Sequence, residues 1–155
     1  MYARILVPTD GSDISAQAER AAIEFARAHG STVVALCIGQ PYPPAAAIEG
    51  AMAIDPATEN AALQAWAARN AARVAEAAKA AGVDCVPVAT IAYAIGDAIL
   101  EQAERHGCDL IFMGSHGRRG LSRLLAGSVT QDVLSAAPVP VMVLRPSPQP
   151  AAPRR

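Results

Sequence analysis

Five short apolar runs, rich in β-branched residues, alternate along this chain with stretches of helical periodicity. Each run has the length of a single strand, and together they cover residues 4–8, 32–38, 85–91, 110–113 and 139–144. Near-continuous apolarity is typical of strands that are covered on both faces. Strands that alternate with helices pair in parallel through right-handed crossovers. The pattern therefore predicts an α/β fold with one doubly wound, five-stranded parallel sheet and helices on both faces.

Four helices are expected between these runs, at about residues 12–29, 58–81, 95–106 and 128–137. In the first helix, the predicted apolar stripe consists of Ile14, Ala18, Ala21, Ala22 and Phe25. In the second helix, the predicted stripe consists of Leu63, Trp66, Asn70, Val74 and Ala77. We therefore interpret Trp66 as a core residue, and we expect Arg73 to lie outside the buried face.

The length of 155 residues fits one domain over residues 1–146, followed by a proline-rich and weakly ordered tail over residues 147–155. The segment from Gln40 to Pro56 has several prolines and few helix signals, so we expect a mobile excursion that can close over a ligand. Without metal or disulfide spacing, the three cysteines are interpreted as small buried hydrophobic residues, namely Cys37, Cys85 and Cys108.

The charge pattern narrows the classes of partner. The formal net charge is -1 and no long basic run occurs, which argues against nucleic acid or a membrane surface as a partner. No apolar stretch approaches the roughly 20 residues that a membrane helix needs. The N-terminal residues lead directly into the first strand and not into a signal peptide, so we expect a cytoplasmic location.

Two polar loops follow the first and fourth strands. In doubly wound sheets, ligands bind beyond the carboxyl ends of the strands, where the strand order reverses. We expect the first and fourth strands to meet at that point. The loops at residues 8–12 and 113–117 should therefore converge on one site.

A glycine pattern runs through the second of these loops into the fourth helix. Gly114 and Gly117 have no Cβ, so each can adopt positive φ and let a phosphate approach the backbone closely. Gly127 and Ser128 open the helix, where free N–H groups and the helix dipole favour anions. The arginines that are expected to screen phosphate charge are Arg118, Arg119 and Arg123. The alternative is that the glycines only permit tight turns and that Ser128 is a simple helix cap.

Other nucleotide signatures are missing from the sequence. Neither a dinucleotide-binding glycine motif nor a P-loop occurs, and Lys79, the only lysine, lies in the middle of a predicted helix. Efficient phosphoryl transfer usually places a lysine on the phosphates. The sequence therefore favours nucleotide binding over turnover, and we assign no catalytic residue.

The pattern G-x2-G-x9-G-S at residues 114–128, with the segments 5–12, 110–119 and 138–144, resembles the ATP-binding branch of the universal stress protein family. The resemblance spans residues 2–145. It implies the adenine nucleotide alpha hydrolase-like fold with strand order 3-2-1-4-5. It also implies ATP held between strands one and four, and a homodimer formed through the last strand, from Val139 to Leu144.

Residue by residue, the resemblance implies the following site. The adenosine side would be lined by Pro8, Thr9, Asp10, Ile38, Met113 and Gly114. The phosphate side would be formed by His116, Gly117, Arg119, Gly127, Ser128, Val129 and Thr130. Magnesium would bridge phosphate oxygens and waters, with Asp10 as the nearby carboxylate and no protein metal site. One departure from relatives lies at residues 92–96, just before the third helix.

The function that follows is an ATP-binding, cytoplasmic, homodimeric stress-response regulator whose protein partner the sequence does not identify. A slow ATP hydrolase or phosphotransferase that uses the arginines and His116 is the first alternative. An interaction module that works without nucleotide is the second.

Overall fold

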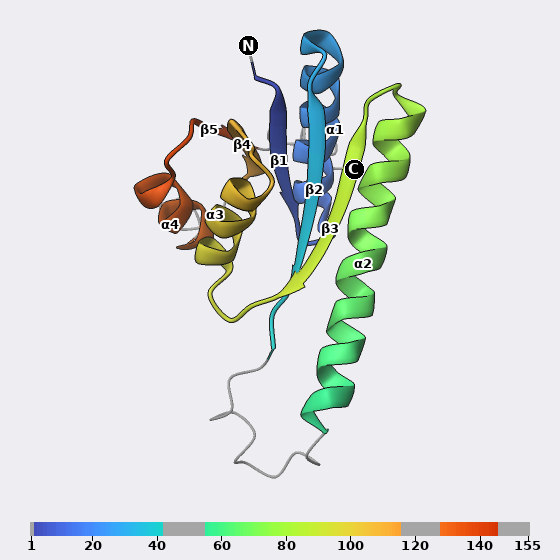
Figure 1. Cartoon of the computed structure of the whole chain (residues 1–155), viewed down its shortest axis with the longest axis vertical. Helices are drawn as coiled ribbons and strands as arrows, with labels where there is room; N and C mark the ends of the chain where they lie inside the picture. The colour runs from blue at the N-terminus through green and yellow to red at the C-terminus, as the bar shows by residue number, and fades with distance from the viewer. Residues whose placement is uncertain (1, 42–54, 116–127, 146–155) are drawn as a thin grey trace, which may run out of the picture.

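The computed structural model describes residues 2–41, 55–115 and 128–145 of the chain. Strands and helices alternate along these residues (Figure 1). In chain order they are β1 (Arg4–Thr9), α1 (Asp13–His29), β2 (Thr32–Gly39), α2 (Pro56–Ala80), β3 (Cys85–Ile91), α3 (Ile95–Arg105), β4 (Leu110–Gly114), α4 (Ser128–Ala136) and β5 (Val141–Leu144). The predicted elements are all present, and β5 is two residues shorter than the apolar run that predicts it, since the run begins at residue 139.

The five strands form one parallel sheet in the order β3-β2-β1-β4-β5, which confirms the predicted topology. The order reverses between β1 and β4, where Ile5 lies opposite Leu110 and Leu6 opposite Ile111. The chain segments that follow these two strands therefore leave the same edge of the sheet side by side. This is where an open α/β sheet provides a binding crevice.

Helices cover both faces of the sheet, because successive side chains of each strand point to opposite faces. On one face, α1 and α2 pack against Ile5, Val7, Val33, Ala35 and Phe112. On the other face, α3 and α4 pack against a second cluster, in which the strand residues are Leu6, Val34, Leu36, Ile111 and Met113. The near-continuous apolarity of the strands is thus explained by burial on both sides.

Both long helices are rotated relative to the predicted stripes. In α1 the buried residues are Ser15, Ala18, Glu19, Ala22, Ile23 and Ala26, so a glutamate lies in the buried face. In α2 they are Ala67, Ala71, Val74 and Ala78, whereas Ala77 is exposed. Alanines allow α2 to approach the sheet closely. The larger Leu63 and Trp66 lie beside this contact face and are half-buried. Trp66 packs against the small core cluster of Cys37, Ala67 and Ala71, so its interpretation as a core residue holds in part.

Helix α2 begins earlier than predicted and extends past the sheet. The side chain of Asp55 caps it by accepting a hydrogen bond from the Thr58 N–H at 3.2 Å, and Pro56 occupies the first turn, where it costs no hydrogen bond. In Figure 1 the first turns of α2 project beyond the carboxyl ends of the strands. They therefore form a wall beside the crevice at the sheet edge.

Helix α3 begins at Ile95 after Ala94, which provides no side-chain cap. A Cβ on Gly96 would lie 2.9 Å from the Cβ of Asp132, so this glycine lets α3 and α4 pack closely. The segment 92–96, where the sequence departs from its relatives, thus still leads into a regular helix.

The buried thiols agree with prediction in two of three cases, since Cys37 and Cys108 are buried and Cys85 is half-buried. No helix in the described ranges is long and apolar enough to cross a membrane. Most of the predicted excursion, residues 42–54, and the tail from residue 146 onward lie outside the described residues.

Candidate functional site

A cavity of about 580 Å³ lies at the carboxyl edge of the sheet, where β1 and β4 end. This volume is in the range of small-molecule sites, which are commonly about 300–1,000 Å³. Eight of the residues predicted for the site line this one cavity, namely Pro8, Thr9, Asp10, Ile38, Met113, Gly114, Val129 and Thr130. They come from β1, β2, β4 and α4, so the sheet topology brings together residues that are far apart in the sequence.

The other predicted residues are not all placed. Ser128 begins α4 and is exposed, and it is not among the residues that line the cavity. The remaining predicted phosphate-side residues lie outside the described part of the chain, namely His116, Gly117, Arg119 and Gly127. The same is true of Arg118 and Arg123.

One glycine of the predicted pattern, Gly114, lies in the described part of the chain. The glycines with positive φ among the described residues are Gly11, Gly30, Gly82 and Gly107, so Gly114 does not use the positive φ that a glycine permits. Gly114 is needed for packing instead. A Cβ on this residue would lie 3.3 Å from the carbonyl oxygen of Ile14 and 3.4 Å from the Cβ of Ala18. Its small size lets α1 approach the end of β4, directly beside the cavity.

The turn between β1 and α1 is held by side-chain hydrogen bonds to its backbone. The Asp10 Oδ1 accepts from the Ser12 N–H at 3.0 Å, and the Ser12 Oγ accepts from the Ser15 N–H at 3.2 Å, as a helix cap does. The Gly11 N–H donates to the Thr9 Oγ1 at 3.1 Å. Gly11 supplies the positive φ of 74° that this tight turn requires. These bonds fix the backbone that carries Thr9 and Asp10 into the cavity.

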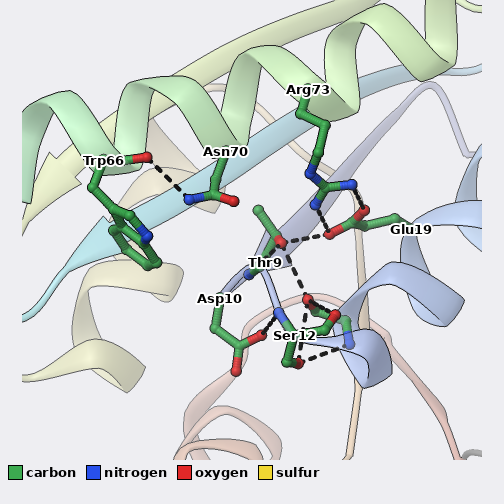
Figure 2. Close-up of polar contacts among 9 residues, drawn as sticks. Thr9, Asp10, Ser12, Glu19, Trp66, Asn70 and Arg73 are labelled. Carbon is green, nitrogen blue, oxygen red and sulfur yellow. Dashed lines mark hydrogen bonds and ion pairs between the residues drawn. The ribbon is translucent and has the colours of Figure 1, made fainter.

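An ion pair between a buried glutamate and a partly exposed arginine lies behind this turn (Figure 2). The Arg73 guanidinium donates two hydrogen bonds of 2.9 Å to the Glu19 carboxylate, one to each oxygen. Only 4% of the Glu19 side chain is exposed, compared with 47% for Arg73. The Thr9 Oγ1 also donates a short hydrogen bond to the Glu19 Oε1. The hydrogen bonds to Glu19 raise the pKa of Arg73, so its guanidinium stays charged.

Helix α2 supplies two cavity residues, Leu63 and Trp66, that were not predicted as part of the site. Figure 2 shows the Trp66 indole extending from α2 toward the level of Asp10. A Cβ on Gly39, at the end of β2, would lie 3.0 Å from the Cβ of Leu63, which shows how closely α2 passes the strand end. Because α2 passes so close to the end of β2, the ring of Trp66 reaches the cavity.

Sequence reasoning also missed Glu19 and Arg73. A glutamate among the alanines of an otherwise buried helix face requires a partner, because an unpaired buried charge is costly. That signal was present in the sequence around Glu19. The sequence did not indicate which of the arginines is the partner, since α2 was predicted with Arg73 facing solvent.

The chemistry of the cavity suits a ligand with an apolar ring and a polar part. Its walls are largely apolar, with Leu36, Ile38, Ile99 and Met113 among the lining residues. Asp10 is the one acidic or basic residue among the described lining residues. Beneath the cavity, burial and the negative charge of Asp10 raise the pKa of the Cys37 thiol to about 11, so the thiol stays neutral. Within the described ranges, no cluster of acidic, histidine or cysteine side chains is arranged to hold a metal ion.

Sequence comparison matches one protein family over all of the residues that line the cavity. The profile of the universal stress protein family matches residues 1–145. A universal stress protein of Methanocaldococcus jannaschii is 32% identical over 149 residues, which cover 94% of this chain and 83% of the relative. The universal stress protein YxiE of Bacillus subtilis is 28% identical over 148 residues, and the match covers 94% of this chain and all of the relative.

Solved structures of the same family share the fold. The structure of the M. jannaschii protein MJ0577 superposes with a TM-score of 0.76 at 26% identity, covering 96% of this chain and 99% of that protein. A universal stress protein in complex with cAMP superposes with a TM-score of 0.67 at 24% identity, covering 92% and 97% of the two chains. One from Archaeoglobus fulgidus in complex with dAMP gives 0.56 at 22% identity, with the same coverage. The fold is therefore the adenine nucleotide alpha hydrolase-like fold of these proteins.

Proposed function

This chain belongs to the universal stress protein family, and on that premise we propose that it binds an adenine nucleotide, with ATP as the expected ligand, in the cavity at the ends of β1 and β4. One observation carries the proposal. Eight residues expected at the nucleotide site, drawn from four separate elements, line a single cavity of suitable size. The existence of relatives solved with cAMP and with dAMP supports the adenine class of ligand.

The nucleoside end of the ligand would occupy the apolar part of the cavity. Ile38 and Met113 offer flat apolar contact for a base, and Trp66 adds an aromatic ring from α2. Aromatic rings stack favourably on bases, which makes Trp66 a suitable partner for adenine. The Asp10 carboxylate is exposed at the turn after β1 and is suited to accept hydrogen bonds from ribose hydroxyls.

The phosphate end would lie toward α4. Val129 and Thr130 line the cavity at the start of this helix, and the positive end of a helix dipole favours phosphate. The sequence motif assigns Gly117, Gly127 and Ser128 to the phosphates, with Arg119 and His116 nearby. Magnesium would then be bound by the phosphates and water, because magnesium favours substrate phosphates over all-protein cages.

The proposed role is regulatory and homodimeric. β5 is an edge strand of the sheet, and its Met142 is 37% exposed, so pairing with a second copy would cover an apolar edge. Nucleotide occupancy would alter how this cytoplasmic homodimer engages its partners under stress. The domain boundary proposed for it lies after residue 146.

The test is calorimetric titration of nucleotide-stripped protein with Mg-ATP. We expect close to one nucleotide per chain. In Gly117→Val the binding should be lost, because a side chain at this position of the glycine motif would block the close approach of a phosphate, while the thermal midpoint stays within about 1–2 °C of wild type. The control is Ala28→Val, an exposed position in α1, which should bind normally.

Two results would contradict the proposal. Unchanged affinity in Gly117→Val would refute the assignment of the phosphate site. An absence of binding by the wild-type protein, confirmed by a second method, would favour the interaction module that works without nucleotide.

A further inference from the structure

The ion pair of Glu19 and Arg73 has a geometry that a purely stabilising pair does not need. Glu19 is 3% exposed and lies in α1, and the partly exposed Arg73 reaches it from α2. Ion pairs with an exposed partner usually add little stability, so the pair is weak evidence for a stabilising role. This pair differs from a simple ion pair because Glu19 also accepts a hydrogen bond from Thr9, and Thr9 lines the cavity.

The hydrogen-bond chemistry of this cluster fixes the direction of the Thr9 hydroxyl. The Thr9 hydroxyl donates its single proton to the Glu19 Oε1, and both oxygens of that carboxylate also accept hydrogen bonds from Arg73. The lone pairs of the Thr9 Oγ1 are then left to accept. One of them accepts from the Gly11 N–H at 3.1 Å, inside the turn that follows β1. The Ser15 Oγ lies 3.2 Å from the same oxygen, on the first turn of α1.

From this geometry we infer that Glu19 and Arg73 are positioning residues for the nucleotide site: they orient the Thr9 hydroxyl as an acceptor and so hold the turn at residues 9–12 in its binding conformation. The inference rests on the proposed function. Thr9 then meets the ligand through its backbone and methyl group, since its hydroxyl proton is committed to Glu19. Because Asp10 is held within the same turn, fixing the turn also fixes the position of Asp10 in the cavity.

Helix α2 contacts the site at three points along one face. Trp66, Asn70 and Arg73 are spaced four and three residues apart, which places them on the same side of the helix. Figure 2 shows all three directed from α2 toward the β1–α1 turn. Trp66 lines the cavity, and the Asn70 Oδ1 lies only 2.7 Å from where a Cβ of Gly11 would be. Arg73 therefore completes a set of contacts through which α2 fixes the turn.

Two sets of variants distinguish a role of the pair in positioning Thr9 from a role in stabilising the fold. The double variant Glu19→Leu with Arg73→Leu removes both charges and fills the same space, so it should fold, and Thr9→Val removes only the hydroxyl. We expect each to bind Mg-ATP about tenfold more weakly than wild type, the effect of losing one well-placed hydrogen bond. The combination of all three changes should be no weaker than either alone, because the three residues act as one unit. Thr9→Ser keeps the hydroxyl and loses only the methyl group, so it should bind more tightly than Thr9→Val and keep the wild-type exchange rate of the Gly11 N–H.

A second readout needs no ligand. The Gly11 N–H should exchange with solvent at least several-fold faster in Thr9→Val and in the double variant than in wild type, because its acceptor is lost or free to rotate. Wild-type affinity in the folded variants with an unchanged Gly11 exchange rate would overturn the inference. If the wild-type chain binds no adenine nucleotide, the proposed function fails. Faster Gly11 exchange would then still establish that the pair holds the turn.

Discussion

Gly11 lies in the turn between β1 and α1, where two constraints exclude a side chain. Its φ is +74°, a conformation in which residues with a Cβ are strained. A Cβ would also lie 2.7 Å from the Asn70 Oδ1, and Asn70 is itself tied by its Nδ2 to the Trp66 carbonyl at 3.0 Å. A side chain at residue 11 would therefore disturb both the turn and the α2 wall of the cavity.

We predict that Gly11→Ala loses about 1–2 kcal/mol of unfolding free energy and also weakens nucleotide binding. The matched control is Gly30→Ala, which has a φ of +66° and nothing within 4 Å of the added Cβ. This control should lose a similar amount of stability, measured by urea unfolding, and keep its affinity. Equal affinity in the two variants would show that the contact with Asn70 does not matter for the site.

At the scale of elements, Asp109 joins the segment before β4 to the start of β1. Its Oδ2 accepts from the Ala3 N–H at 2.8 Å, and its Oδ1 accepts from the Arg4 N–H at 3.0 Å. Partial burial of the carboxylate acts to raise its pKa. The hydrogen bonds from Ala3 and Arg4 outweigh that effect, and the pKa lies below the ordinary value of 3.8. The charged form of Asp109 thus helps to align the two strands that frame the cavity.

The lowered pKa of Asp109 determines how the free energy of unfolding changes with pH. A carboxylate whose pKa is lower in the folded state contributes stability above its unfolded pKa, and the contribution is lost as the pH falls through the folded pKa. We predict that wild type is more stable than Asp109→Asn at about pH 6–7 and that the difference shrinks as the pH falls below about 4. Urea unfolding from about pH 2.5 to about pH 7 measures this, with Asp84→Asn as the control for loss of one carboxylate. A difference that stays constant down to the lowest pH would contradict the prediction.

For the whole molecule, periodicity was enough to predict the sheet and its helices, because strands buried on both faces leave a clear apolar signal. The meeting of β1 with β4 was expected from the polar loops that follow these strands and from the strand order that the family resemblance implies, since periodicity alone does not give the order of strands. The rotation of α1 and α2 did not follow. In alanine-rich helices several faces look equally apolar, so the predicted stripe of α2 included Ala77, which is exposed, and that of α1 left out Glu19, which is buried.

The central claim is that an adenine nucleotide occupies the cavity at the ends of β1 and β4. The most direct test is to titrate isotope-labelled protein with Mg-ATP and to follow its amide and indole NMR signals. We predict saturable shifts concentrated at residues 9–10, Ile38, 113–115 and 129–130, together with the Nε1–H of Trp66, the only tryptophan in the chain. Saturable shifts confined to residues outside the cavity, or none at millimolar nucleotide, would contradict the claim.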